Sequence, residues 1–211
     1  MAVAKKVGTS TTLLEAAKKV LRLSGYAGLS TRDVAAAAGV PLSQIHYHFG
    51  SKQGLMLALF DYLNAQLLDR QNAMFHDSAL TLSQRWDRAC DYLDEDIASG
   101  YVRVLQELIA ASWSDPTVAK VVRTGLMGWV DLITDVARQA ERELGGLGPF
   151  SAVEVATLIA SAFSGGESAY LLGLEKKGLP VRQALRRVGD AIRIAESKSS
   201  TRSGHAREAA Q

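Results

Sequence analysis

The sequence predicts an all-α protein, with a small three-helix unit at the N-terminus and a larger helical body after it. Apolar residues recur every three or four positions along most of the chain, which is the spacing of one helix face. No segment has the alternation of apolar and polar residues that is typical of a half-buried strand. Glycine and proline lie between the periodic segments, where they commonly end or begin helices.

The three N-terminal helices have clear boundaries. The first is expected at 10–24 and ends before Gly25, which can adopt the left-handed conformation of a helix C-terminus. The second begins after Ser30, which an acidic residue follows three positions later as in a capping box, and it runs to Gly39. A short third helix is expected at about 41–49, because a proline suits its first position.

Six further helices are expected in the body, and prolines or glycines mark several of their ends. They span 52–75, 81–98, 101–113, 116–144, 151–175 and 180–196.

The composition indicates a globular protein of a reducing compartment. Its 211 residues are 47% apolar, which is enough to enclose a substantial core. No apolar run reaches the roughly 20 residues that span a bilayer, and the N-terminus lacks the apolar segment of a secretory signal. Cys90 is the only cysteine, so no internal disulfide forms and we expect a cytoplasmic protein with no membrane partner.

The net charge of +2 is unevenly distributed. Residues 1–52 contain seven basic and two acidic residues, residues 53–175 contain eight basic and seventeen acidic, and residues 176–211 contain nine basic and three acidic. A basic N-terminal part on an acidic body predicts that the N-terminal part contacts a polyanion.

The second and third helices, joined by a tight turn at Gly39, match the helix-turn-helix pattern. The side chains expected to pack inward are Val34, Val40, Ile45 and Phe49. The side chains expected to face outward are Ser43, Gln44, Tyr47 and His48. The outward set consists of hydrogen-bond donors and acceptors suited to base edges and phosphate oxygens in a DNA major groove.

Two segments, "LLEAAKKVLRLSGYAGLSTRDVAAAAGV" and "HYHFGSKQGL", carry a specific combination of features. They contain a glycine–aromatic pair before the second helix, an alanine-rich helix ending in Gly-Val, a terminal "HYHF" and a lysine opening the fourth helix. The run from Leu13 to about Leu59 thereby resembles the N-terminal domain of the tetracycline-repressor (TetR) family of bacterial transcriptional regulators. Beyond residue 60 only the helical layout and the length agree.

The resemblance implies a set of DNA-contacting residues: Thr31, Arg32, Leu42, Ser43, Gln44, His46, Tyr47, His48 and Lys52. Leu42, Ser43 and Gln44, at the start of the third helix, match positions that touch bases. Thr31 and Arg32, at the start of the second helix, match contacts to phosphate or an adjacent base. His48 and Lys52 match phosphate contacts, which a helix N-terminus favours at Lys52. The family's usual tyrosine is His46 here, and Tyr47 occupies the variable position, so a contact at His46 would be sensitive to pH.

The last two helices predict a dimer interface. The segment 151–175 is apolar almost all round, so it needs cover on more than one side. Two such helices from each of two subunits would form a four-helix interface with twofold symmetry, as in TetR-like proteins. Its expected residues are Val155, Leu158, Ala162, Gly166, Ala169, Val181, Leu185, Val188 and Ile192. Arg182, Arg186 and Arg193 are expected on the solvent side.

Large side chains in the body either fill a core or, as the resemblance implies for some of them, line a mostly apolar effector cavity, and the sequence leaves both alternatives open. The candidate lining residues are Trp86, Tyr101, Trp113, Met127, Trp129, Phe163 and Glu167. Glu167 lies on an apolar stripe, so its carboxylate needs a partner, either an arginine across the dimer or a polar group of a ligand.

Metal binding and catalysis are not indicated. His46 and His48 are two residues apart and point in different directions, and the chain has no H-x-x-x-H or E-x-x-H motif. No Ser/His/Asp arrangement and no phosphate-binding glycine-rich loop is present, so we expect neither an enzyme nor a cofactor. The acidic run "DYLDED" at 91–96 is interpreted as a solvated face.

These observations predict a dimeric, ligand-responsive transcriptional regulator, most readily a repressor that binds a palindromic operator and is released by a small-molecule effector. The alternatives are an activator, a ligand-independent DNA binder, or a helical small-molecule-binding protein without DNA binding. The expected parts are a disordered basic arm at 1–8, a helix-turn-helix DNA-binding domain at 9–54, an effector-binding and dimerisation domain at 55–196 and a disordered tail at 197–211.

Overall fold

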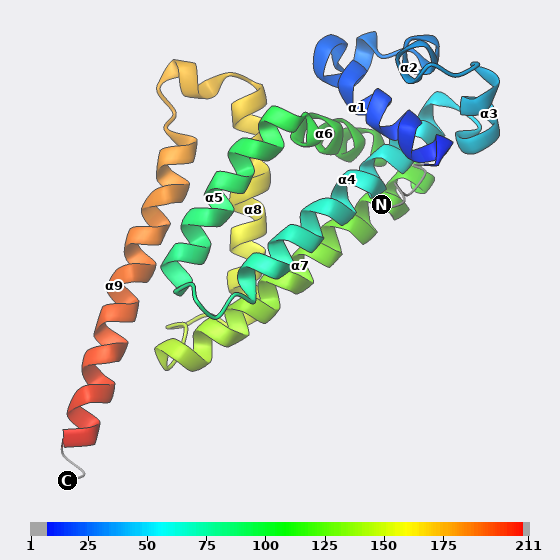
Figure 1. Ribbon diagram of the computed structural model, residues 1–211. Helices are drawn as coiled ribbons and strands as arrows, with labels where there is room; N and C mark the ends of the chain where they lie inside the picture. The colour runs from blue at the N-terminus through cyan, green and yellow to red at the C-terminus, as the bar shows by residue number, and fades with distance from the viewer. Residues whose placement is uncertain (1–7, 209–211) are drawn as a thin grey trace, which may run out of the picture. The chain divides into compact units, whose positions relative to one another are not determined.

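The computed structural model describes residues 8–208, except the side chains of residues 26, 27 and 200–208, and every regular element in that range is helical (Figure 1). The elements are α1 Thr9–Gly28, α2 Thr31–Ala38, α3 Ser43–Phe49, α4 Lys52–Phe75, α5 Leu82–Ser99, α6 Tyr101–Ser112, α7 Pro116–Leu144, α8 Ala152–Leu171, the 3-10 helix η1 Leu174–Lys177 and α9 Val181–Glu208. The predicted all-α class is confirmed. Residues 1–7 of the expected basic arm lie outside the described residues.

The described chain divides into two compact units. Unit 1 contains the described residues up to Leu67 together with Asp96–Gly125, and unit 2 contains Leu68–Glu95 together with the described residues from Leu126 onward. The division therefore falls inside α4 and α7.

The first half of α4 belongs to unit 1 because it shares a core with α1 and α6. Phe60 of α4 is fully buried, and its ring stacks on that of Tyr101 with the centroids 6.1 Å apart. The Tyr101 hydroxyl donates to Asn64 Oδ1 at 3.0 Å, and the Tyr62 hydroxyl donates to Glu15 Oε1 at 2.7 Å. Burying one large apolar side chain stabilises a fold by about 1.5–3 kcal/mol.

Gly25 interrupts α1 as the sequence predicts. Its φ of 67° and ψ of −179° lie outside the helical region, in a part of conformational space that glycine adopts readily. Just before it, Ser24 Oγ donates to the Val20 carbonyl at 2.8 Å. A short helical stretch follows the break and reaches Gly28.

Local interactions at both ends of α2 position the turn into α3. Ser30 Oγ accepts a hydrogen bond from the Asp33 backbone N–H at 3.1 Å, which caps the N-terminus. Gly39 is left-handed, with a φ of 68°, and it ends the helix. Val34 and Ile45 are fully buried, so the predicted packing of α2 and α3 is confirmed at these two positions.

In unit 2, α9 lies alongside α5 and is joined to it by ion pairs (Figure 1). The pairs are Arg182–Asp94 at 2.9 Å, Arg186–Asp91 at 2.9 Å and Arg193–Asp87 at 3.1 Å. These side chains remain about 40–50% exposed, so both faces are solvated in part as expected, but they also pair with each other, which the sequence did not predict. Each face is polar as predicted, but the two faces, about 90 residues apart in the chain, bind each other.

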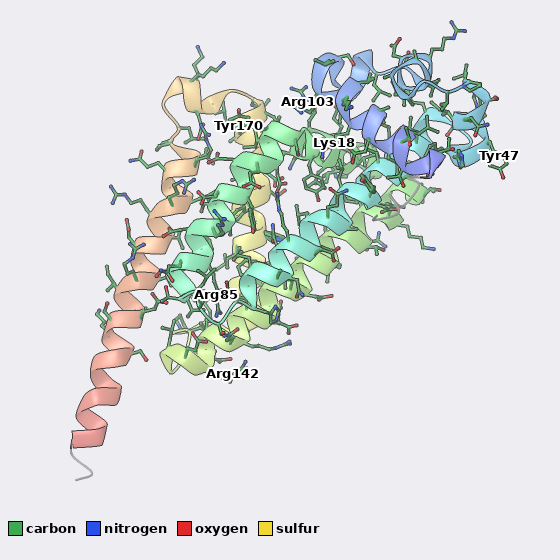
Figure 2. The ribbon with its side chains drawn as sticks, in the orientation of Figure 1. Lys18, Tyr47, Arg85, Arg103, Arg142 and Tyr170 are labelled. Atoms are coloured by element: carbon green, nitrogen blue, oxygen red, sulfur yellow. The ribbon has the colours of Figure 1, made fainter. Side chains whose placement is uncertain are left out.

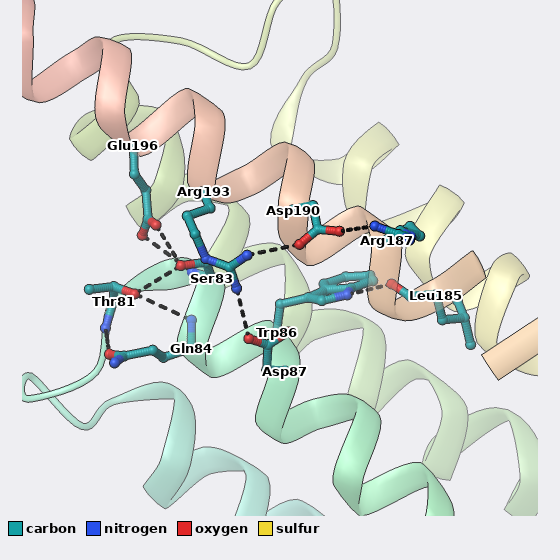
Figure 3. A network of polar contacts seen from close by, with 10 residues as sticks. All are labelled: Thr81, Ser83, Gln84, Trp86, Asp87, Leu185, Arg187, Asp190, Arg193 and Glu196. Carbon is teal, nitrogen blue, oxygen red and sulfur yellow. Dashed lines mark hydrogen bonds and ion pairs between the residues drawn. The ribbon is translucent and has the colours of Figure 1, made fainter. Parts of the chain in front are cut away.

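Further polar contacts attach the N-terminal end of α5 to α9 (Figure 3). Ser83 Oγ donates to Glu196 Oε2 at 2.6 Å, and the Ser83 backbone N–H donates to Glu196 Oε1 at 3.2 Å. A carboxylate is favourable there because a helix N-terminus carries partial positive charge. Trp86 Nε1 donates to the Leu185 carbonyl at 2.7 Å, which satisfies the buried indole nitrogen.

The last helix is longer than the sequence predicts. We expected it to end at 196 and a disordered tail to follow, but α9 continues to Glu208. Ser199 Oγ donates to the Glu143 carbonyl of α7 at 2.9 Å, so this extension contacts the end of another helix. The extension contains no proline, which lets the helix continue. Residues 209–211 lie outside the described part.

None of the described helices is long and apolar enough to cross a bilayer. In the part of the chain whose side chains the structure describes, no group of three or more His, Cys, Asp or Glu is placed to hold a metal ion. Burial raises the pKa of the Cys90 thiol to about 11, so this thiol stays protonated and serves as a small core group on α5.

Candidate nucleic-acid interface and ligand cavity

The helix α3 presents a polar face that the protein core does not use. Ile45 anchors the helix and is fully buried, whereas Gln44 and Leu42 are half-buried. The exposed side chains are Ser43, His46, Tyr47 and His48. Tyr47 is 82% exposed (Figure 2), although an aromatic ring of this size is normally at least partly covered. This face is therefore available to an external partner.

His46 has a partner within the chain. Its Nδ1 lies 3.2 Å from the Gly50 carbonyl oxygen, and Gly50 has a φ of 73° just after the end of α3. When Nδ1 carries the proton it donates to this carbonyl, which leaves Nε2 for an external contact. The position at which the sequence departs from the family pattern thus contributes to the end of α3.

The other predicted DNA-contacting residues lie at helix N-termini of the same unit. Arg32 is exposed and Thr31 half-buried in the first turn of α2, and Lys52 is the first residue of α4. Burial raises the pKa of Glu107, and the positive charges of Arg103 and Lys52 oppose that shift. The charge of Lys52 therefore acts on a carboxylate of unit 1 as well as on any bound anion. All nine predicted residues lie between the start of α2 and the start of α4.

Unit 2 contains an apolar cavity of about 320 Å³. Its wall consists of Gln71, Phe75, Leu82, Arg85, Trp86, Ala89, Trp129, Ile133, Val136, Ala137, Ala140, Leu144, Leu147, Phe150, Val155, Leu158, Ile159, Phe163, Val188 and Ile192. Phe163 makes edge contacts with both tryptophans, its ring centroid lying 5.8 Å from that of Trp86 and 5.7 Å from that of Trp129. The volume is at the lower end of the range for ligand pockets, about 300–1,000 Å³.

Three of the seven predicted pocket residues, Trp86, Trp129 and Phe163, lie in this wall, and the other four do not. Tyr101 belongs to the core of unit 1. Trp113 is 83% exposed and Met127 is 49% exposed. Glu167 is half-buried on α8 away from the wall, and it has an interaction partner in the structure. Large aromatic side chains occur in the core, in the cavity wall and on the surface of this protein. Residue type alone therefore could not identify which residues line the cavity.

Arg85 was not among the predicted pocket residues, but it lies in the cavity wall. Figure 2 labels this residue, which belongs to α5. It is only 5% exposed. A signal was present, since Arg85 occupies the apolar stripe of α5 between Leu82 and Ala89 at helical spacing.

The residues predicted for the dimer interface have several different environments. Val155, Leu158, Val188 and Ile192 lie in the cavity wall. Leu185 and Gly166 are buried within the chain, and a Cβ added at Gly166 would lie 2.9 Å from Val181 Cγ1 and 3.6 Å from Leu185 Cδ1. Ala169 is also buried. These apolar stripes therefore serve the packing of α8 on α9, and Ala162 is exposed as an interface residue would be in an isolated subunit.

Comparison with known proteins identifies the N-terminal segment. Residues 13–59, from α1 to the middle of α4, match the family model of bacterial regulatory proteins of the tetR family. This segment of the chain is similar to the TetR family. The matched segment contains α2, the turn at Gly39 and α3 in full, so the resemblance predicted from the sequence is confirmed.

A curated relative and solved TetR structures agree with this. The HTH-type transcriptional regulator CymR of Pseudomonas putida is 33% identical over 119 residues, which are 54% of this chain and 56% of that protein. The match thus spans little more than half of that relative's length. A TetR transcriptional regulator from Legionella pneumophila has a TM-score of 0.68 at 19% identity, covering 89% of this chain and 99% of that one.

A transcriptional regulator from Saccharomonospora viridis, solved in complex with choline, has a TM-score of 0.71 at 23% identity, covering 84% of this chain and 93% of that one. At such identities the likeness establishes the fold. It extends the similarity beyond the helix-turn-helix to the helices of unit 2.

Proposed function

We propose that this protein is a transcriptional repressor that binds a palindromic operator as a homodimer and is released from it by a small-molecule effector. The observation that carries the proposal is the exposed polar face of α3, in which Tyr47 is 82% exposed, inside the segment that matches the TetR family. The family consists of regulatory proteins, which argues against an enzyme. According to this proposal α3 lies in the major groove, where its side chains contact base edges.

Phosphate contacts would position this helix on the duplex. Arg32 and Lys52 lie in the first turns of α2 and α4, where the helix dipole adds to the attraction for an anion. Contacts of this kind bind all sequences alike and give the salt dependence that is typical of DNA binding.

The exposed face of α8 supports the homodimer. Leu158 is 55% exposed, Ala162 is exposed, and a Cβ added at Gly165 would meet no atom within 4 Å. The hydroxyls of Thr157 and Ser161, on the same face, donate to carbonyls one turn earlier at 2.8 Å each, so they need no external partner. Small residues on such a face allow close approach of a second helix, and α8 of a second copy is the partner that twofold symmetry supplies.

The cavity of unit 2 supports the effector. It is enclosed largely by apolar side chains and it contains a few polar groups, as ligand sites commonly do. A relative of the same fold was solved with a small molecule, choline. An effector that prefers the cavity in the DNA-free state would lower DNA affinity by its differential binding, typically about 1–3 kcal/mol.

The test is binding to the DNA upstream of the protein's own gene, measured by fluorescence anisotropy at several salt concentrations. We expect specific binding that is about 10³-fold or more tighter than binding to random DNA, and a logarithm of affinity that falls linearly with the logarithm of salt. Deleting the gene should raise transcription from the bound promoter. Equal affinity for specific and random fragments from every neighbouring promoter would contradict the proposal, and reduced transcription after deletion would favour an activator.

A further inference from the structure

Arg85 is a buried cation without a counterion. Its side chain is 5% exposed in the cavity wall, and Nη2 donates to the Asp77 carbonyl oxygen at 3.0 Å. Nε and Nη1 are buried and have no hydrogen-bond partner. Among the side chains that the structure describes, no carboxylate forms an ion pair with Arg85.

This arrangement is costly in an empty cavity. An arginine side chain remains charged throughout the physiological pH range, so it does not escape burial by losing its proton. A buried charge with unpaired donors loses the hydration of the unfolded chain and gains little in return. Such a group in a cavity wall indicates that the natural ligand supplies the missing negative charge.

The remaining polar groups of the wall point to the same kind of ligand. Gln71 Oε1 accepts a hydrogen bond from Trp129 Nε1 at 2.7 Å, which leaves the NH₂ group of Gln71 as its unused polar end. The indole nitrogen of Trp86 is already paired with Leu185. Among the described lining residues, the polar side-chain groups still available are therefore hydrogen-bond donors, and they match a ligand that accepts.

We propose that the cavity binds an organic monocarboxylate with a compact apolar or aromatic body, and that its carboxylate pairs with the guanidinium of Arg85. One negative charge balances one arginine, whereas a phosphate monoester carries about −1.5 to −2 and would leave excess charge in an apolar wall. The body of the ligand packs between Trp86, Trp129 and Phe163. The volume of about 320 Å³ excludes a bulky body. This assignment rests on the proposed function, since it names the chemical class of the effector.

The experiment compares two probes of equal shape, 2-naphthoate and 2-naphthamide, by calorimetric titration of the full-length protein without DNA. We expect the acid to bind about tenfold or more tightly than the amide, because only the acid pairs with a buried charge. Arg85→Met should abolish this preference and retain the binding of the amide, which also checks that the cavity is intact. Arg85→Gln, which keeps a donor near the Asp77 carbonyl, should lose the preference in the same way.

The matched control is Arg88→Met, one turn further along α5, where the side chain is 58% exposed and pairs with Asp91 at 3.8 Å. It should keep the wild-type preference for the acid. Equal binding of acid and amide by the wild type, binding of neither, or an unchanged preference in both Arg85 variants would overturn the proposal.

A second titration, against the protein–operator complex, separates this inference from the proposed function. If the acid binds through Arg85 but does not release DNA, the effector assignment in the proposed function fails and the carboxylate site stands. If specific DNA binding is present and the acid has no preference over the amide, the carboxylate site fails and the proposed function stands.

Discussion

Arg186 of α9 and Asp91 of α5 form an ion pair in which Nη2 lies 2.9 Å from Oδ1. The same nitrogen lies 3.1 Å from Asp94 Oδ2, so one guanidinium bridges two carboxylates on neighbouring turns of α5. These side chains are about 40% exposed, and a single pair of this kind contributes only about 0–1 kcal/mol. Its main effect is on geometry, because it aligns two helices that both contribute to the wall of the cavity.

Acid should weaken the attachment of α9. Hydrogen bonds from Arg182 hold the pKa of Glu175 below its ordinary value of 4.5. A carboxylate with a lowered folded-state pKa contributes stability that is fully present above its unfolded pKa and is lost as the pH falls through the folded value. We expect Glu175→Gln to lower the Tm slightly at pH 7, and the difference from wild type to shrink progressively as the pH falls below 4.5.

Glu141→Gln is the control for this series, because the Glu141 side chain is exposed and forms no ion pair or hydrogen bond in the described part of the chain. Its Tm difference from wild type should stay near zero throughout. A Tm difference for Glu175→Gln that is constant from pH 7 to pH 3 would contradict the prediction.

Two glycines of α7 should respond in opposite ways to alanine. A Cβ added at Gly125 would lie 2.8 Å from two ring atoms of Phe60, which is fully buried, so Gly125→Ala should destabilise the fold by about 1–3 kcal/mol. At Gly128 the nearest atom is Leu68 Cδ1 at 3.4 Å, an ordinary contact. Gly128→Ala should then be neutral or stabilising by up to about 1 kcal/mol, because alanine favours helix.

Denaturant unfolding measures both free energies of unfolding. If both variants change stability by the same amount, the close approach of α7 to Phe60 is not present in solution.

Gln44 and Lys52 should affect DNA binding in different ways. Gln44→Ala removes hydrogen bonds that only the correct base can form. It should therefore weaken the binding free energy by about 1–3 kcal/mol on operator DNA and by little on random DNA. Lys52→Ala removes a charge that acts on every sequence, so both affinities should fall alike and the salt slope should decrease by about one. Anisotropy titrations on both DNAs distinguish the two. Equal losses for Gln44→Ala on both would show that residue 44 does not read a base.

A charge on the exposed face of α8 should separate the proposed dimer. Ala162 is exposed in the isolated chain, so Ala162→Arg should leave the Tm of the subunit little changed while burying a charge in the dimer. Light scattering should then report monomers. Ala65→Arg on α4, also at an exposed alanine, should remain dimeric. An unchanged dimer for Ala162→Arg would place the interface elsewhere. Leu185 is unsuitable for this test, because it is 6% exposed within the chain.

The sequence by itself determined the N-terminal helices and the exposed polar face of α3. Ser30 and Gly39 act on groups at most four residues away, so the start of α2 and its end could be predicted from neighbouring letters. The exposed face of α3 could be predicted from helical periodicity, because Ile45 is the residue of this short helix that is buried. Local hydrogen bonds and helical periodicity suffice wherever the partners are close in the chain.

Only the tertiary structure decided which helix faces pack against each other when they are far apart in the sequence. Asp91 and Arg186 are 95 residues apart, and nothing local indicates that their two polar faces pair with each other. Arg85 donates to the Asp77 carbonyl and lies in the wall of a cavity that is lined from α4, α5, α7, α8 and α9, which no local pattern indicates. Charge and periodicity determine whether a helix face is polar or apolar. Which other helix packs against that face depends on the folding of the whole chain, and this packing decides which side chains are buried, which form ion pairs and where the cavity lies.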